Sequence, residues 1–251
     1  MKTRTLIIAG LTSFLLTSLT QIPARLVTER LPAELPVTLQ GVSGSLWQGS
    51  AASLHWQNVQ LRDVEWNLQP ATLLKGQLAA SLRAHLAQGG EVDGDCGISF
   101  GGTLHCSDLN VTGLPAQALA PYLQHLMIPP LRGQFQATLD SLEWDRENLP
   151  QVSGQVEWQE AGIQLNPQSF GQYSATLSVD ANNQQQISLA SAPDAAFTLD
   201  GQTTVQPDRQ YQTNINIKPG RDVDAGVKQF LGMMGKPQPD GSYRVEQQGS
   251  F

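Results

Sequence analysis

The chain has 251 residues and a formal net charge of −7, and without Lys2 and Arg4 its 13 basic and 22 acidic residues leave about −9. This acidic balance, with no basic stripe to offset it, excludes nucleic acid as a partner. The abundance of Gln, Ser, Thr, Gly and Ala is more typical of strands and turns than of long surface helices.

The N-terminus predicts membrane targeting. Lys2 and Arg4 precede an uncharged stretch at residues 5–24. Twenty residues in a helix rise about 30 Å, which matches the hydrocarbon core of a bilayer. The cationic start predicts that residues 1–4 stay in the cytoplasm and that residues 25–251 are translocated.

Two fates are open to the apolar segment. Ser18 and Thr20 could precede the cleavage site of a secretory signal, but no Ala-x-Ala triplet is present. Apolar residues continue beyond Pro23, at Leu26 and Val27. A retained, single-pass transmembrane anchor is the preferred interpretation, and a cleaved signal is the alternative.

Most of the translocated region predicts short strands, because apolar and polar residues alternate between turn residues. A one-residue slip in the alternation near Arg62 and Asp63 predicts a β-bulge. The alternating segments are residues 59–68, 78–86, 135–139, 173–179, 187–189, 197–205 and 211–217. They predict a mainly β fold with antiparallel strands.

Two or three short helices are predicted to cover the sheet. A single turn should begin at Pro70 within residues 68–75, and helical stripes run over residues 115–127 and 222–234. A weak similarity between residues 41–56 and 131–144 could mark two related halves. A candidate boundary therefore lies near residue 128.

Cys96 and Cys106 are the only cysteines. A hairpin that turns over Phe100, Gly101 and Gly102 would place the two cysteines opposite each other on one face, within disulfide reach. Zinc is the rival interpretation because His105 adjoins Cys106, but a second pair of ligands is missing. A structural disulfide in an oxidising compartment is therefore predicted.

The segment 41–76 is dense in glycine and tryptophan. Its G-x-x-G-x-x-W-x-G pattern is followed by a W-x-L-x-P-x-x-L-L-x-G run. The motif residues are Gly41, Gly44, Trp47, Gly49, Trp56, Trp66, Pro70 and Gly76. Glycines of this kind supply positive φ at turns, and the tryptophans are most simply buried plugs of a sheet. A row of ligand-contacting tryptophans on an open sheet face is the alternative.

This block resembles the N protein of the bacterial type II secretion system (the GspN family). The resemblance implies an inner-membrane helix and a periplasmic β-rich domain in a non-enzymatic component that supports the export of folded proteins. It implies protein contacts with the inner-membrane platform, the outer-membrane secretin or the pseudopilus.

A broader similarity connects the chain with AsmA-like inner-membrane proteins, which share the anchor and the early Gly-Trp pattern. That similarity implies a curved sheet with an apolar trough and, as the alternative function, envelope lipid binding or transfer with phospholipid as the ligand.

Catalytic and cofactor signatures are absent from the sequence, so we predict neither an enzyme nor a cofactor or metal site. The four histidines have no metal-ligand spacing: His55, His85, His105 and His125. The best candidate for paired carboxylates is an acidic run around Trp144: Asp140, Glu143, Asp145 and Glu147. This run leads to Pro150 and is predicted to be a solvated turn at a strand end.

Overall fold

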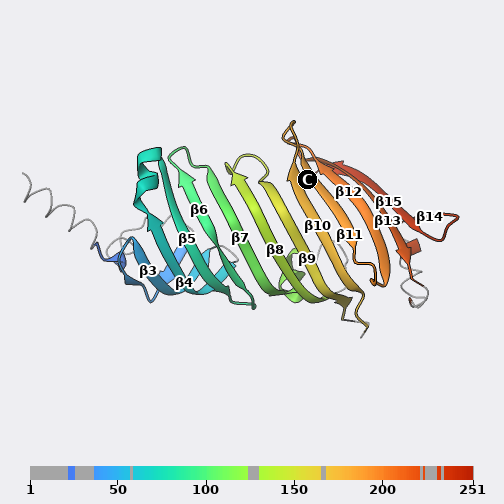
Figure 1. Ribbon diagram of the computed structural model, residues 1–251, viewed down its shortest axis with the longest axis horizontal. Helices are drawn as coiled ribbons and strands as arrows, with labels where there is room; N and C mark the ends of the chain where they lie inside the picture. The colour runs from blue at the N-terminus through green and yellow to red at the C-terminus, as the bar shows by residue number, and fades with distance from the viewer. Residues whose placement is uncertain are drawn as a thin grey trace, which may run out of the picture.

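The computed structural model is an antiparallel, curved β-sheet (Figure 1). It describes residues 22–25, 37–56, 59–123, 130–164, 168–220, 223, 231–232 and 235–250. The predicted cytoplasmic start and residues 5–21 of the predicted anchor lie outside the described residues. None of the helices within the described ranges has the length and apolar character needed to cross a bilayer.

Fifteen strands build the sheet. They are β1 (Val37–Gln40), β2 (Ser43–Gly44), β3 (Gln48–Trp56), β4 (Val59–Gln69), β5 (Gln77–Leu86), β6 (Glu91–Ser99), β7 (Leu104–Pro115), β8 (Leu131–Trp144), β9 (Gln151–Ile163), β10 (Gly171–Val179), β11 (Gln185–Ser191), β12 (Phe197–Val205), β13 (Gln210–Pro219), β14 (Lys236–Pro237) and β15 (Tyr243–Ser250). The predicted mainly β, antiparallel fold is confirmed.

Neighbours in sequence are almost always neighbours in the sheet. The order is β1-β3-β4-β5-β6-β7-β8-β9-β10-β11-β12-β13-β15-β14, with β2 paired to β3. In such a meander, short turns connect successive strands, and hydrogen bonds between adjacent strands satisfy their backbone groups. The two ends of the sheet lie far apart along the long axis (Figure 1).

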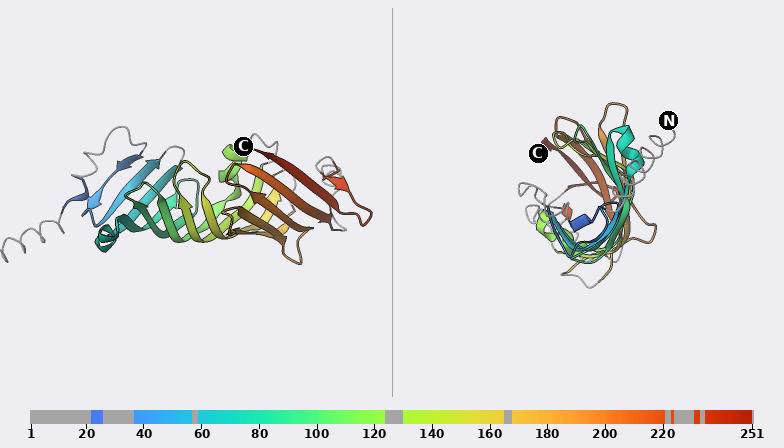
Figure 2. Two further views of the ribbon diagram at one scale, coloured as in Figure 1. Left: turned by 90° about the horizontal axis from the view of Figure 1, so that it is seen from above. Right: turned by 90° about the vertical axis from the view of Figure 1, so that its left-hand side faces the viewer.

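The sheet is bent into an open trough when viewed along its long axis (Figure 2). Several strands carry β-bulges, which increase local twist and bending. The predicted bulge in β4 is confirmed: the register with β5 shifts between Arg62 and Glu65, and Asp63 has φ 48°. Asp108 in β7 and Glu160 in β9 have similar left-handed backbones.

The buried core is thin because the strands form one layer. The most enclosed cluster consists of Ala51, Val64 and Ala84, and Leu54 and Trp66 are among the half-buried side chains that pack against it. Within the described residues no large side chain is fully buried. Small residues therefore occupy the places where the trough is tightest.

Two of the three predicted helical segments contain helices, but a role in covering the sheet is not confirmed. Helix η1 (Pro70–Lys75) is a 3₁₀ turn with Pro70 at its start, and it continues the β4 end. Helices η2 (Ala116–Leu119) and α3 (Ala120–Leu123) follow β7. Most of the predicted helix at 222–234, and the candidate boundary near residue 128, lie outside the described residues.

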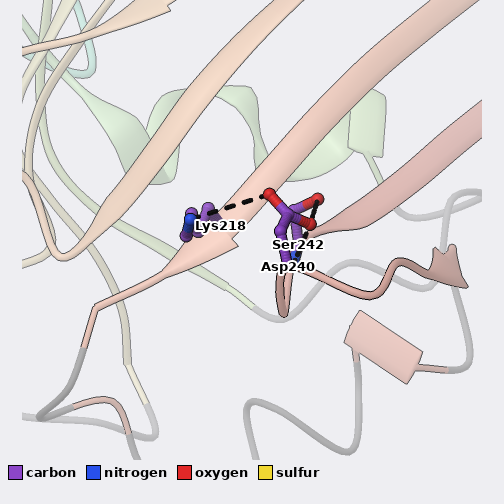
Figure 3. A network of polar contacts seen from close by, with 3 residues as sticks. All are labelled: Lys218, Asp240 and Ser242. Carbon is purple, nitrogen blue, oxygen red and sulfur yellow. Dashed lines mark hydrogen bonds and ion pairs between the residues drawn. The ribbon is translucent and has the colours of Figure 1, made fainter.

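The C-terminal end of the sheet is held by a small polar network (Figure 3). Lys218 Nζ at the end of β13 lies 3.6 Å from Asp240 Oδ2, and the Ser242 hydroxyl donates to Asp240 Oδ1 at 2.7 Å. Ser242 is buried. Hydrogen bonds from Ser242, and the nearby Lys218 charge, hold the pKa of Asp240 below its usual value. The network connects β13 to the turn that leads into β15.

Cys96 and Cys106 are bonded to each other in the structure. They are direct cross-strand partners in the β6–β7 hairpin, with Cα atoms 4.1 Å apart. The Ser99 side chain and backbone close the intervening turn by hydrogen bonds with Thr103. The predicted hairpin disulfide is present, and its position indicates a structural role.

Replacing both cysteines by alanine should destabilise the sheet near this hairpin. Closing a loop of this length is worth about 3 kcal/mol through the entropy of the unfolded chain. Urea unfolding should show this loss in Cys96→Ala/Cys106→Ala. Dithiothreitol should destabilise the wild type to a similar extent and leave the variant unchanged. An unchanged unfolding midpoint in the variant would contradict a stabilising bridge.

Candidate functional site

The most extensive candidate site is one face of the sheet. Direct cross-strand partners share a face, and one row of partners is apolar from β5 to β15. Its members are Ala84, Val92, Val111, Ala137, Val156, Ala175, Leu189, Gly201, Ile215 and Val245. A continuous apolar path therefore crosses ten strands. The residues before and after each member along its strand are mostly polar, and they point to the opposite face.

Burial indicates that the apolar face lies on the inside of the bend, because Leu189, Ile215 and Val245 are each half-buried between exposed neighbours on their strands. The buried hydrophobic side chains, including Ala51, Val64 and Ala84, belong to this face or to its continuation into β3 and β4. The opposite face carries polar cross-strand rows such as Asp200, Asn216 and Arg244, all of which are exposed. The strands form a single curved layer (Figure 2). The inner face is therefore enclosed by curvature and not by a second sheet.

Three aromatic rings form a second row on the inner face. Phe135, Trp158 and Tyr173 are register partners on β8, β9 and β10. The centroids of Phe135 and Trp158 are 5.6 Å apart with the rings stacked, and those of Trp158 and Tyr173 are 6.0 Å apart. The Trp158 indole N–H donates to the Arg132 carbonyl at 2.8 Å. The row is thereby fixed in orientation.

Tyr173 uses its hydroxyl within this row. It donates to the Phe170 carbonyl at 3.1 Å and accepts from the Phe197 amide at 3.3 Å. Burial raises the pKa of Tyr173 to about 12, although the hydrogen bond from Phe197 acts in the opposite direction. The phenol therefore remains neutral well above physiological pH.

The glycines of the 41–76 block allow the chain to approach itself closely. A Cβ on Gly49 would lie 2.5 Å from Trp66 Cζ2 and 2.8 Å from the Ser43 carbonyl oxygen. Gly41 and Gly44 have φ of 66° and 82°. The positive φ predicted for these two glycines is present. The same prediction is wrong for Gly49, which lies within β3 and does not have a positive φ. There the Trp66 ring packs directly on the glycine backbone.

The same block holds the described part of the N-terminal segment. The Trp66 indole N–H donates to the Leu46 carbonyl at 3.0 Å, and the Leu46 amide donates to the Ile22 carbonyl at 2.8 Å. Pro23 forms an isolated bridge with Ser45, and Ala24 is 1% exposed. Residues 22–25 are thus fastened to the sheet through Trp66 and the loop before β3.

The other motif residues have local roles. Pro70 starts η1, and Gly76 ends it in a left-handed conformation with its amide donating to the Leu73 carbonyl. Trp47 accepts a hydrogen bond at its carbonyl from the Leu68 amide, at 2.7 Å. Trp56, at the end of β3, remains 40% exposed, so the predicted burial is wrong for this residue.

A polar hollow of about 740 Å³ adjoins the Gly-Trp block. Glu65, Arg83, Asp93 and Asn110 are among the residues that line it. Across the described ranges no group of three or more His, Cys, Asp or Glu side chains is arranged to hold a metal ion.

The acidic run at residues 140–147 surrounds the end of β8. Asp145 accepts hydrogen bonds from the amides of Glu147 and Asn148, and these bonds, chiefly that of Asn148, lower its pKa. Glu143 faces His105 at 3.9 Å across the sheet. The carboxylates are used in a turn and on the polar face, which agrees with the solvated-turn prediction.

Sequence reasoning missed the aromatic row and the exposure of large apolar side chains around η1, at Leu74 and Phe100. Phe135 and Tyr173 belonged to predicted strands, but nothing local to either residue indicates that Trp158 lies between them. Only the strand register brings these rings together. The sequence signal for this exposure was the pair of adjacent leucines, Leu73 and Leu74, because the short segment that ends at Gly76 has no separate polar and apolar sides.

Comparison with known proteins gives consistent similarities. Residues 36–246 match the family model described as type II secretion system (T2SS), protein N. The chain is 27% identical to type II secretion system protein N of Vibrio cholerae serotype O1 over 232 residues, which cover 92% of this chain and 91% of that protein. It is 27% identical to the Aeromonas hydrophila protein of the same name over 254 residues, or 99% of each chain. No solved structure matches the chain.

Replacing Gly49 by alanine should destabilise the block. The added methyl group would overlap the Trp66 ring and two carbonyl oxygens, and overpacking of this kind costs about 1–3 kcal/mol. Gly101→Ala is the matched control, because the nearest atom to its Cβ would be the Ser99 hydroxyl at 3.6 Å. Urea unfolding monitored by tryptophan fluorescence should separate the two variants; equal midpoints would contradict the close contact.

The pKa of Tyr173 predicts a loss of stability in alkali. A tyrosine in the unfolded chain ionises near pH 10, whereas folded Tyr173 ionises at about 12. The contribution of neutral Tyr173 to the free energy of unfolding is fully present below about pH 10. It is lost as the pH rises to about 12, because unfolding then releases a proton from this tyrosine. The free energy of unfolding of Tyr173→Phe, measured by urea titration, should fall less steeply in this window than that of the wild type. Parallel curves would contradict the assignment.

Proposed function

Because the chain belongs to the type II secretion system protein N family, we propose that it is a non-enzymatic component of the secretion machinery, anchored in the inner membrane with its sheet in the periplasm. In this role it supports export of folded proteins across the outer membrane through contacts with other secretion components. The candidate partners are the inner-membrane platform, the outer-membrane secretin and the pseudopilus.

The observation that carries the proposal is the single ladder of strands from β1 to β15. Fourteen strands follow one another along the path, and strands in a sheet lie about 4.8 Å apart, which makes a body on the order of 60 Å long. The described N-terminal residues lie at one end and β15 at the other (Figure 1). An elongated, hydrogen-bonded body of this kind is suited to connecting components at different depths of the periplasm.

The anchor is supported by the basic residues Lys2 and Arg4 and the uncharged stretch after them. Residues 22–24 contact the sheet through Leu46 and Ser45. These contacts support a membrane segment that ends before Ile22 rather than at residue 24, where the sequence predicted its end. The close attachment supports a tether that remains part of the mature protein.

The apolar inner face favours a second function, the binding or transfer of envelope lipid. A row of apolar residues that crosses ten strands offers a path for an acyl chain, and the curvature of the sheet shields it from water. This function is compatible with membership of the secretion family, since a lipid could occupy the trough of a scaffold. Lipid binding is detected by phospholipid that co-purifies with the protein, whereas the secretion role is detected by export of exoproteins.

Deletion of the gene should abolish or strongly reduce secretion of exoproteins while leaving the levels of the other secretion components unchanged. Complementation with the full chain should restore export. A version whose residues 1–21 are replaced by a cleavable signal should not, because the sheet would lose its tether. Normal export in the deletion strain would overturn the proposed function, and full rescue by the untethered version would overturn the anchor.

Phospholipid that co-purifies with the protein should distinguish the lipid-binding function. Mass spectrometry should detect less phospholipid in Val156→Asp, because the charge enters the apolar row. Gln155→Asp is the matched control, since this neighbour lies on the opposite face. Circular dichroism checks that both variants fold. Equal lipid in both folded variants, or none in the wild type, would argue against a lipid trough.

A further inference from the structure

Large apolar side chains are exposed together at one corner of the sheet. Leu74 is 93% exposed and Phe100 is 74% exposed, and Leu73, Leu78 and Ile98 are each more than a third exposed. We call these five residues the apolar tip. Isolated exposed apolar residues are ordinary, but a contiguous exposed group marks an interaction surface.

The apolar tip is a built feature rather than a loose loop. Helix η1 ends at Gly76, whose carbonyl accepts a hydrogen bond from the Phe100 amide at 2.9 Å. This bond fastens the β6–β7 turn beside η1. Leu78 and Ile98 are cross-strand partners, and they lie on the same face as the disulfide and the apolar rows. The tip is therefore the outer end of the inner face.

The apolar tip lies at the same end of the sheet as the described N-terminal residues (Figure 2). Leu46 donates to the Ile22 carbonyl, and the next residue, Trp47, accepts at its carbonyl from Leu68. Helix η1 begins two residues after Leu68, at Pro70. The chain that leaves the proposed anchor and the exposed leucines are thus connected through one short path of backbone hydrogen bonds.

The charge around the tip differs from that of the rest of the molecule. Lys75 is the only Asp, Glu, Lys or Arg in residues 70–82, and residues 96–104 contain none. The whole chain carries −7. An apolar surface with one cation and no carboxylates matches the interface of an anionic bilayer, whereas the acidic remainder of the domain is repelled from it.

We infer that the apolar tip inserts into the interfacial layer of the inner membrane and places the open end of the apolar face against the lipid. The inference rests on the proposed anchor, because the anchor holds this end of the sheet at the bilayer. Leu74 and Phe100 enter the acyl boundary, Lys75 meets lipid phosphates, and Leu78 and Ile98 connect the bilayer with the inner face. A protein partner at the tip is the competing outcome.

Fluorescence quenching in vesicles tests this contact. The full chain with Leu74→Cys is labelled with nitrobenzoxadiazole, since Cys96 and Cys106 are bonded to each other and leave a single free thiol. It is reconstituted into vesicles of phosphatidylethanolamine and phosphatidylglycerol, with or without nitroxide-labelled lipid. Ala181→Cys is the matched control, because Ala181 is exposed in the β10–β11 turn on the same rim, far from the anchor end.

The label at position 74 should show a blue-shifted emission and should be quenched by nitroxide lipid, whereas the label at position 181 should show neither change. A protein that floats with the vesicles but is not quenched at position 74 would overturn the membrane contact and leave the anchor intact. A change at position 74 that requires added secretion components would identify a protein contact and overturn the inference as well. A protein that does not float with the vesicles would overturn the anchor and the tip together.

Discussion

Backbone pairing between successive strands is the interaction on which this structure depends. A single-layer sheet has no second layer against which to bury its apolar face. Hydrogen bonds between the strands must therefore hold the fold together, and the curvature of the sheet must reduce the exposure of that face to water. The consequence is visible in the core, where the most enclosed positions are small, such as Ala51 and Ala84, and large side chains stay partly accessible. Aromatic stacking at Trp158 and the cystine at Cys96 reinforce the ladder locally.

The same constraint gives the protein an apolar face that its own chain does not use completely. In a two-layered domain such a face would be buried against the second layer. Here it runs from Leu78 and Ile98 beside the exposed tip to Val245 near the far end. A scaffold role and a lipid-binding role therefore draw on the same architecture: the ladder provides length and the sheltered face provides affinity for apolar groups.

Local features were predictable because they depend on neighbouring residues. The bulge at Asp63 follows from a slip in the alternation, and the cystine follows from the symmetric turn between its cysteines. Pro70 and Gly76 delimit η1 by their backbone preferences. The aromatic row was not predictable, because Trp158 meets Phe135 and Tyr173 only through the register of three strands, and each bulge changes which residues share a face.

The sequence by itself determined the strand-rich composition, most strand positions, the disulfide and, through the Gly-Trp block, the resemblance to a secretion family. Alternation of polar and apolar residues also determined that the sheet has two unlike faces. Only the tertiary structure decided which face turns inward, and that Ile22 is fastened to Leu46 beside Trp66. The reason is that side-chain alternation is a property of each strand, whereas register and curvature arise from contacts between strands.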